Sequence, residues 1–533
     1  MKVVISRFFC WERNRLRTFE TYINPPHRRC YGNPNLNFMK KFLLCSVALL
    51  SAFAVNAQEK VKEVVTADYN RSSLSYVFVS RNHMDSDVRK SYEAQTIGDK
   101  FDENIIATEY LEVKTATGVG VSATDVLEAV NNEQVGKEII MSIFNAQADG
   151  SFNDEVVRAR GMYNAKDQDI KNLAAAKVKE VAYEWGEPLI NSSYILVFDV
   201  YKTGRKTSDK GTTYSANAVA HVYKLSGDKA VIDEFYAKAW ANPDSSDAEK
   251  AAAKAEFAKM RFDMLHVASV SALGSSSDSK YSKGSIYDAC NKAFESALFN
   301  LEKKISAWQV ATAVCAVKPI AAKIGTKEGV KNADRYQAYS YKENKDGELM
   351  SVKRGYVRAT VISNNSGIAT GDTKPSYFYQ ISGAGNVKEG YTLKEKKDIK
   401  LGVSLTGGLA AAGFRLGLDF DYIGHISKRG FITYGMLNAG LNFSGYMLAD
   451  AAIGAGFGIP ASRFFEITPY VMVGGYYDID SEAIVAYTAE PGVRLMATFH
   501  PFAVGVTAGC QAFLGGDYAG AAGVIKLAVK WTF

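Results

Sequence analysis

The stretch FRLGLDFDY at positions 414–422 decides the fold of the C-terminal third of this 533-residue chain. Its large apolar side chains alternate with Arg, Gly and Asp, and such alternation predicts a β-strand whose two faces meet different surroundings. The last ten residues, VIKLAVKWTF at positions 524–533, repeat the pattern with Lys526 and Lys530 on the minority face. Both stretches therefore indicate long strands of one sheet.

Eight such runs follow one another from residue 399 to the end of the chain. They lie at 399–408, 412–423, 430–443, 445–459, 464–477, 483–499, 502–514 and 519–533, with short Gly-, Pro-, Ser- and Asp-containing turns between them. Short turns between long strands favour antiparallel neighbours. Eight strands of this length suit a small closed barrel whose interior holds side chains but no pore. We expect an all-β, eight-stranded antiparallel barrel over 396–533.

The charges of this segment lie on the minority face of the strands. A soluble barrel turns its apolar face inward, whereas a membrane barrel turns it toward lipid and keeps a polar lumen. Charges of both signs can pair inside a narrow lumen, so we expect the second arrangement. The residues expected in the lumen are Arg415, Asp419, Asp421, Asp450, Glu466, Arg494, Lys526 and Lys530. The alternative is a secreted soluble barrel or sandwich that places these charges on its solvent face.

The C-terminal Lys-Trp-Thr-Phe, with Trp531 and Phe533 at outward positions, resembles the terminal assembly signal of bacterial outer-membrane β-barrel proteins of the small eight-stranded type. The resemblance is one of class and concerns residues 396–533 alone. It implies outer-membrane lipid and the barrel-assembly machinery of a Gram-negative cell envelope as partners. Because an even number of strands leaves both barrel ends on one side, it also implies a periplasmic N-terminal region.

A secretory signal peptide is predicted over 39–57. The stretch MKKFLLCSVALLSAFAVNAQ at 39–58 combines two lysines, an apolar core and an A-x-A-like site, which predicts cleavage between Ala57 and Gln58. Residues 1–38 are Arg-rich and without periodicity, so we interpret them as an upstream over-extension with Met39 as the true start. An atypical leader that begins at Met1 is the alternative.

The overall charge does not indicate a nucleic-acid partner. The chain has a formal net charge of +6, but residues 1–57 carry nine Lys/Arg and two Glu, which leaves −1 on residues 58–533. The cysteine spacing suits neither a zinc site nor a disulfide framework. Cys290 and Cys315 are either a periplasmic disulfide or two buried free thiols.

Residues 58–316 are expected to form a mixed α/β periplasmic domain. We predict a helix from Asp167 to about Trp185 that Gly186 and Pro188 end. A strand at 194–200, a loop at 203–213 and a partner strand at 214–223 follow. An Ala-rich helix is predicted from Ser246 to about His266, then a mobile Gly/Ser loop at 271–285 and a helix that starts at Ile286.

Residues 317–395 are expected to form a small β-domain with strands at 335–341, 352–363 and 377–381. The turn GVKNAD at 329–334 weakly resembles a G-V-x-x-G-D turn of small β-barrel modules in bacterial envelope-assembly proteins. Ala333 stands here at the glycine of that pattern. The run KEKKD at 394–398 is interpreted as a charged hinge into the barrel.

No motif predicts a catalytic, metal-binding or cofactor-binding residue. Gly118-Val119-Gly120 approximates a dinucleotide fingerprint, but a helix-entry turn with Ser122 or Thr124 as the cap is favoured. His221 is expected on a surface or a rim. The remaining weak candidates are read as a solvated loop, a polar turn and a Ser-rich loop: His83, Asp85 and Asp87; Asp478, Asp480 and Glu482; Ser277 and Lys280.

We therefore expect a non-enzymatic outer-membrane barrel protein whose periplasmic region has a binding or envelope-assembly role, with a periplasmic protein as a further partner and no cofactor. One alternative is an envelope enzyme with its site in 58–316 and a barrel anchor. The other is a secreted soluble β-protein.

Overall fold

The computed structural model describes residues 60–61, 65, 71–81, 85–161, 178–343, 349–366, 374–383, 385–443, 447–516 and 520–533. The predicted leader, with Met1, Met39, Ala57 and Gln58, lies outside these residues. So do His83 and the predicted start of the helix at Asp167.

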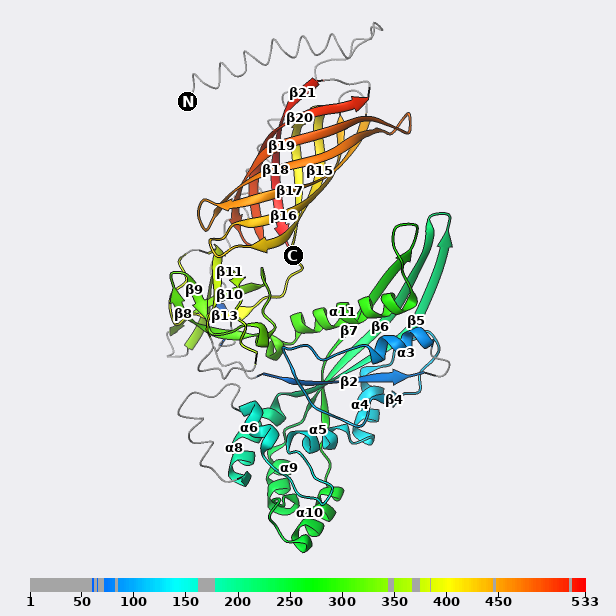
Figure 1. Ribbon diagram of the computed structural model, residues 1–533, viewed down its shortest axis with the longest axis vertical. Coiled ribbons are helices and arrows are strands. Elements are labelled where there is room, and N and C mark those ends of the chain that lie inside the picture. Colours follow the sequence, from blue (N-terminus) through cyan, green and yellow to red (C-terminus); the bar gives the residue numbers. More distant parts are fainter. Residues whose placement is uncertain are drawn as a thin grey trace. The chain divides into compact units, whose positions relative to one another are not determined.

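A mixed sheet forms the centre of the α/β region (Figure 1). Its strand order is β3-β2-β5-β6-β7, and β4 also pairs with β2. β2 runs parallel to β5, whereas β5, β6 and β7 form an antiparallel meander. The strands are β2 (Ser73–Ser80), β3 (Asp102–Glu103), β4 (Tyr110–Glu112), β5 (Ser193–Ser208), β6 (Gly211–Leu225) and β7 (Met264–Asp278).

Helices cover both faces of this sheet. On one face, Tyr92 of α3 (Ser86–Glu93) and Ala293 of α11 (Ile286–Lys304) share a core with Phe198. On the other face, Ile139 shares a core with Val197. The elements on that side are α4 (Ala123–Asn132), α5 (Val135–Ile143), α6 (Glu155–Gly161), α8 (Val178–Asn191), α9 (Lys229–Glu234), the π-helical turn η1 (Phe235–Ala239) and α10 (Asp247–Lys259). β5 is therefore buried on both faces from Ser193 to Val200.

Side-chain caps set several helix starts. Ser122 accepts a hydrogen bond from Asp125 N and begins α4, as predicted. Ser246 and Glu249 form a capping box at the start of α10. Ser285 caps α11 through Asp288 N. Because side chains within the first turn determine where each of these helices begins, the sequence predicts their first residues correctly.

The predicted end of α8 is wrong. The helix continues through Gly186 and Pro188 to Asn191. A Cβ at Gly186 would lie 2.7 Å from the ring of Phe144, so this glycine serves helix packing rather than helix termination. Tertiary packing overrides the local stop signal here.

Three boundaries around the meander also differ from prediction. α10 ends at Lys259, and the chain enters β7 at Met264 instead of continuing as a helix to His266. The predicted loops at 203–213 and 271–285 are mostly strand, because β5, β6 and β7 extend in register to Ser208, Gly211 and Asp278. Composition indicated loops at these positions, but cross-strand pairing supports Ser- and Thr-rich strands.

A second sheet closes on itself between the α/β region and the C-terminal barrel. Its pairings run from β10 to β11, β12, β9, β8 and β13 and return to β10, and β1 adds to the edge of β11. The strands are β1 (Lys60–Val61), β8 (Ala311–Val317), β9 (Ile320–Ala322), β10 (Arg335–Glu343), β11 (Leu349–Val361), β12 (Ser376–Ser382) and β13 (Thr392–Glu395), with short 3₁₀ turns η2 (Ser306–Trp308) and η3 (Thr326–Glu328). We call this sheet the small barrel.

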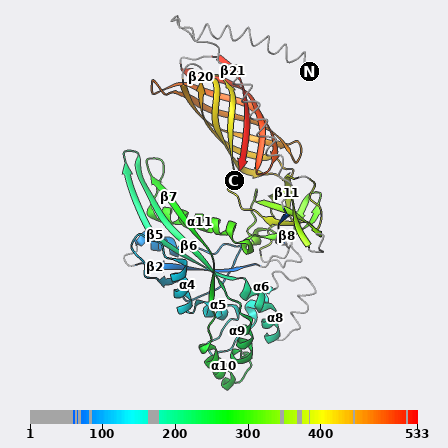
Figure 2. The ribbon, with the colours of Figure 1, turned by 180° about the vertical axis from the view of Figure 1, so that it is seen from behind.

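The C-terminal part is a closed antiparallel barrel of eight strands, which confirms the predicted fold class. Each strand pairs with the next in sequence, and β14 pairs with β21 to close the ring (Figure 2). The strands are β14 (Leu401–Ala410), β15 (Gly413–Ile426), β16 (Ile432–Phe443), β17 (Met447–Pro460), β18 (Phe465–Asp478), β19 (Ala483–Phe499), β20 (Phe502–Gly516) and β21 (Gly520–Thr532). Their bounds agree with the eight predicted runs to within a few residues.

In the part of the chain that the structure describes, no helix combines the length and apolar character needed to span a bilayer.

Candidate functional site

The inner face of the C-terminal barrel holds its charged residues. Arg415, Asp419, Asp421, Arg494, Lys526 and Lys530 are buried, and Asp450 and Glu466 are partly buried. Hydrogen bonds join these side chains to residues of strands that are not neighbours in the sheet. Such contacts can form only across the interior of a closed barrel, so the lumen is filled by polar side chains.

Asp421 is the centre of one charged group. Its side chain is fully buried, and Arg494 Nη1 donates to both carboxylate oxygens at 2.7 and 2.8 Å. Lys530 Nζ lies 2.9 Å from Asp421 Oδ2. One carboxylate from β15 thus pairs with two cations, from β19 and β21.

Glu490 is the centre of a second group that sequence reasoning missed. Lys526 Nζ donates to Glu490 Oε1 at 2.8 Å, and the Tyr470 hydroxyl donates to the same oxygen at 2.7 Å. Gln511 Nε2 lies 3.4 Å from Oε2. Glu490 occupies the buried phase of β19, so strict alternation along 483–499 could have identified it.

Arg415 forms the third group near the other end of the strands. Its guanidinium donates to Asp450 through Nε and Nη2 at 2.9–3.0 Å, and Nη1 lies 3.6 Å from Asp419. Asn442 Nδ2 also donates to Asp450 at 2.6 Å. Glu466 instead accepts from the Tyr434 hydroxyl at 2.9 Å. Ion pairs and hydrogen bonds therefore occupy the lumen at several levels.

The outer face of the same barrel is apolar and exposed. Leu416 and Leu418 are 40% and 45% exposed, whereas their neighbour Arg415 is 2% exposed. Trp531 and Phe533, the residues of the predicted terminal signal, are also half exposed and stack on each other. Further exposed apolar side chains of this face are Leu405, Leu409, Leu437, Leu441, Ile453, Val471, Val473, Val493, Leu495, Ile525, Leu527 and Val529.

The charged run expected to be a hinge is anchored at each end. Glu395 accepts from Lys100 Nζ at 2.7 Å and from Val310 N at 3.2 Å, and Lys397 pairs with Glu302 of α11. Burial itself favours the neutral acid, but the nearby ammonium groups of Lys100 and Lys397 outweigh it and lower the pKa of Glu395. This segment thus joins the small barrel to the α/β region through buried charges.

Asp398, at the end of the same run, is anchored to the small barrel, and one of its partners also contacts the C-terminal barrel. Arg358 Nη2 donates to Asp398 at 2.5 Å, and Arg335 Nε lies 3.5 Å from the same carboxylate. Arg335 also donates from Nη1 to His500 Nε2 at 2.8 Å, in the turn between β19 and β20. Burial and the two nearby guanidinium groups hold the pKa of His500 well below its usual value, so the ring is a neutral acceptor.

The GVKNAD turn contacts the end of β15. Asn332 Nδ2 donates to Ile426 O at 2.8 Å, and Ile426 N donates to Asn332 Oδ1 at 2.9 Å. Ala333 has a φ of +67°, a left-handed conformation that favours glycine. A glycine at this position would adopt the same conformation without strain.

The Gly118–Val121 segment is a helix-entry turn, as favoured from sequence. Asp199 is fully buried and accepts two hydrogen bonds from Arg81 at 2.7 Å and one from Val121 N at 3.0 Å. Arg81 also donates to Val119 O at 2.7 Å. The turn is therefore held by an internal ion pair.

His221 is buried, so its predicted surface position is wrong. Its Nε2 lies 3.0 Å from Val121 O, which fixes that nitrogen as the donor and makes Nδ1 the acceptor for the Ser269 hydroxyl at 2.7 Å. His266 Nε2 lies 2.8 Å from the same hydroxyl. Burial lowers the pKa of His221, and the ring is a neutral base. His221 and Ser269 are register partners on β6 and β7, so pairing of the strands alone accounts for this contact.

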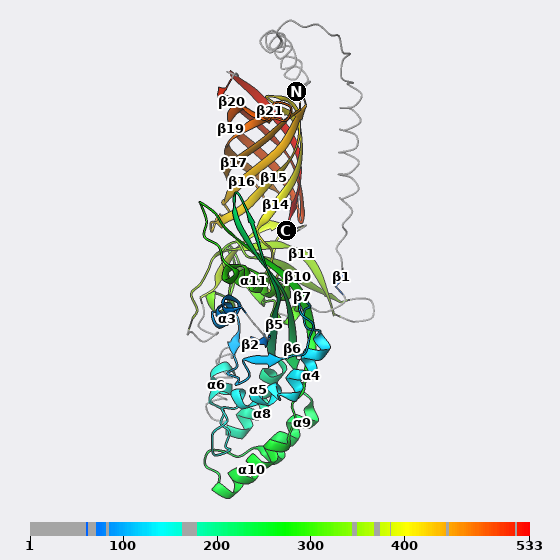
Figure 3. The ribbon, with the colours of Figure 1, turned by 90° about the vertical axis from the view of Figure 1, so that its right-hand side faces the viewer.

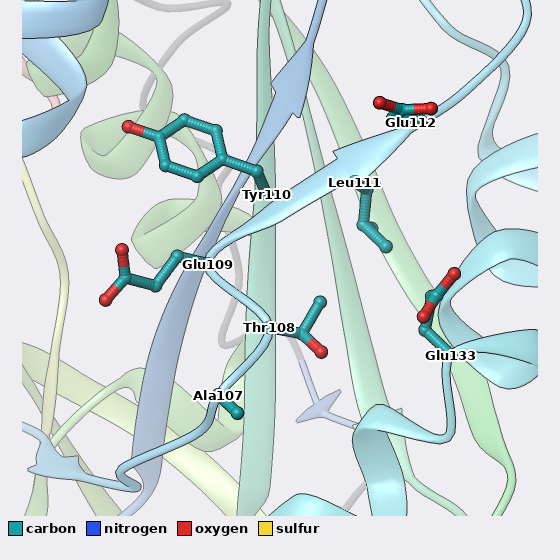
Figure 4. Close-up of a pocket in the computed structure, with 7 residues that line it drawn as sticks. All are labelled: Ala107, Thr108, Glu109, Tyr110, Leu111, Glu112 and Glu133. Atoms are coloured by element: carbon teal, nitrogen blue, oxygen red, sulfur yellow. The ribbon is translucent and has the colours of Figure 1, made fainter.

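A shallow pocket of about 440 Å³ lies beside β4 (Figure 4). Ala107–Glu112 and Glu133 line it, and Figure 4 shows Glu109 on the side opposite Glu133. The carboxylates do not converge on one point, and no group of three or more His, Cys, Asp or Glu with metal-binding geometry occurs within the described residues.

The weak sequence candidates have structural positions. Asp85 caps α3 through Asp87 N, and Asp478 accepts from Asp480 N in the turn after β18. Ser277 lies in β7, and Lys280 lies two residues beyond the end of that strand. Cys290 and Cys315 are both free thiols, but only Cys290 is buried, and burial raises its pKa to about 12.

No known protein-family model matches this sequence, and no curated protein matches it.

Proposed function

We propose that the chain is an outer-membrane β-barrel protein of a Gram-negative envelope and that its N-terminal region has a non-enzymatic binding or assembly role in the periplasm. One observation carries the proposal: the C-terminal barrel is apolar outside and charged inside. In water, an exposed apolar surface of this extent promotes aggregation, whereas in a bilayer lipid chains cover it.

The lumen contacts support an anchor rather than a channel. The groups around Asp421, Glu490 and Arg415 fill the interior with paired charges. An eight-stranded barrel has little further space once its inward side chains are in place. We therefore expect no ion conductance from the protein in a planar bilayer.

The position of the N-terminal region follows from strand number. Both ends of an eight-stranded barrel lie on one side of the membrane, and in outer-membrane barrels that side is the periplasm. The small barrel and the α/β region precede β14, so they emerge on that side. The anchored 394–400 segment supports a role in which they are held near the membrane.

Two native thiols test the membrane assignment. Cys510 lies on the outer face of β20, and Cys315 lies in β8 of the small barrel; both side chains are exposed. With residues 58–533 refolded into liposomes, a water-soluble maleimide should label Cys315 quickly and Cys510 slowly. Unfolding in denaturant should make the two rates equal.

A lipid-phase quencher supplies the second readout. A fluorophore on Cys510 should be quenched by spin-labelled lipid, whereas one on Cys315 should not. If Cys510 reacts with the maleimide as fast as Cys315 in liposomes and the lipid quencher leaves it unaffected, the barrel is not in the bilayer and the proposal fails.

A further inference from the structure

The end of the β5–β6–β7 meander carries two turns side by side (Figures 1 and 3). β5 and β6 meet at Ser208 and Gly211, and Thr212 of β6 is the register partner of Asp278 at the end of β7. The hairpin 202–214 and the segment 278–285 therefore form one surface. We call these two segments the basic tip.

Positive charge is concentrated on the basic tip. It contains two acids, Asp209 and Asp278, against six cations, all of them exposed: Lys202, Arg205, Lys206, Lys210, Lys280 and Lys283. Residues 58–533 carry −1 in total, so a +4 tip leaves −5 on the rest of that segment. The distribution produces a local positive potential that the net charge hides.

An aromatic side chain projects from the same surface. Tyr281 is 89% exposed, and Lys280 Nζ lies 5.7 Å from its ring centre. Arg205 lies at the same distance from the Tyr214 ring. A tyrosine flanked by cations suits the headgroup layer of a bilayer, where the ring contacts the apolar boundary and the hydroxyl stays wet.

We propose that the basic tip docks on the surface of an anionic phospholipid bilayer. A bilayer presents many phosphates in one plane, so cations on two adjacent turns can contact several phosphates at the same time. Basic segments near an anionic surface gain affinity with each Lys or Arg. This inference goes beyond the proposed function and does not depend on insertion of the C-terminal barrel.

Vesicle flotation tests the proposal. Residues 58–533 are placed in neutral phosphatidylcholine nanodiscs, which cover the barrel, and are mixed with equimolar phosphatidylcholine/phosphatidylglycerol vesicles at low salt. We expect co-flotation with these vesicles, none with pure phosphatidylcholine vesicles, and loss of binding when salt is raised to about 0.5 M. If the barrel proves water-soluble, the same flotation is done without nanodiscs.

Matched triple variants separate the tip from net charge. Lys206→Gln, Lys210→Gln and Lys280→Gln together should weaken vesicle binding by roughly a hundredfold. The control removes the same charge from exposed lysines elsewhere, Lys90→Gln, Lys229→Gln and Lys259→Gln, and should change affinity by less than about threefold. Unchanged circular dichroism spectra verify folding of both.

Three outcomes would overturn the proposal. The first is equal weakening in both triple variants, which would indicate a net-charge effect. The second is binding to neutral vesicles as tight as to anionic ones. The third is equally tight binding of soluble polyglutamate at the same charge concentration, which would make the tip a site for acidic protein rather than lipid.

Discussion

Replacing Asp421 with Asn perturbs the lumen at the point where it is most tightly paired. Asn has nearly the size of Asp, so the packing of β15 is kept while the negative charge is removed. Asn keeps one acceptor oxygen, so Arg494 Nη1 loses one of its two acceptors and the charge that strengthens both bonds, and Lys530 Nζ loses the carboxylate that lies 2.9 Å away. Two cations remain in a buried position without their common anion.

The expected cost is large. Removing one partner of a buried ion pair costs about 3–5 kcal/mol, because the remaining charge is left uncompensated. Asp421 is fully buried and serves two cations, so we expect the upper part of this range, about 5 kcal/mol. Domains are stable by about 5–15 kcal/mol, so the variant should lose a substantial share of its folding free energy.

Urea unfolding of residues 58–533 in detergent measures this cost. The folded barrel is followed by its shifted band in unheated gel samples, and the midpoint should move to much lower urea. Asp480→Asn, in the exposed turn after β18, removes the same charge and should change stability by less than about 0.5 kcal/mol. Adding Lys530→Met to Asp421→Asn should recover part of the loss, since one unpaired cation is then gone.

A small effect would refute the reasoning. If Asp421→Asn lies within about 1 kcal/mol of Asp480→Asn, the lumen cations are hydrated well enough to need no partner. The lumen would then be wetter than the pairing geometry indicates, and ion conductance in a planar bilayer would be expected.

Three further predictions concern the outer face and the anchored segment. Leu418→Arg should lower the free energy of unfolding by about 2–4 kcal/mol in lipid, because the new charge faces the bilayer, whereas Gln511→Arg should lower it less, because the carboxylate of Glu490 lies nearby. Urea midpoints in liposomes measure both effects, and the reverse order would contradict the assignment of the outer face to lipid. Because the pKa of Glu395 is lowered in the folded protein, its carboxylate stabilises the fold above the ordinary pKa of about 4.5, and this stabilisation is lost as the pH falls through the lowered pKa. Lys100→Met should therefore reduce the fall in melting temperature at acid pH, and an unchanged fall would show that the Lys100–Glu395 pair is not its source. His500 stays neutral in the folded protein, so stability should fall as the pH drops below about 6.5, where the ring takes up a proton in the unfolded chain. His500→Gln should remove this pH dependence, and a dependence that persists in the variant would come from another group.

The strands of the C-terminal barrel were predictable because a single pattern, the alternation of apolar and polar residues, indicates them. In 414–422, the apolar and polar residues occupy opposite phases of a strand, and the same phases separate exposed Leu418 from buried Asp421 in the structure. Turn residues then set the strand ends. The pairing partners were not predictable, because Arg494 and Asp421 are distant in sequence and only the closed ring brings them together.

Predictions failed where tertiary contacts override local composition. The Ser-rich end of β7 is strand because β6 pairs with it, and α8 passes Gly186 because Phe144 packs there. His221 is buried because the turn before α4 contacts its ring and β7 pairs with its strand, a placement that an isolated strand pattern does not contain. The charge run at 394–398 indicates solvent by composition, but its partners are buried residues that lie between 40 and 295 positions away in the sequence.

The anchored segment at 394–400 has a consequence for recombination between related chains. Its boundary with β14 is the obvious place to join a different barrel, yet Asp398 and Lys400 are matched to Arg358 and Asp334 on one side, and Arg335 reaches His500 on the other. A crossover at this position would keep those ion pairs but would separate Arg335 from its acceptor at His500 in the hybrid. Viable chimeras should therefore take the small barrel and the turn at His500 from the same parent.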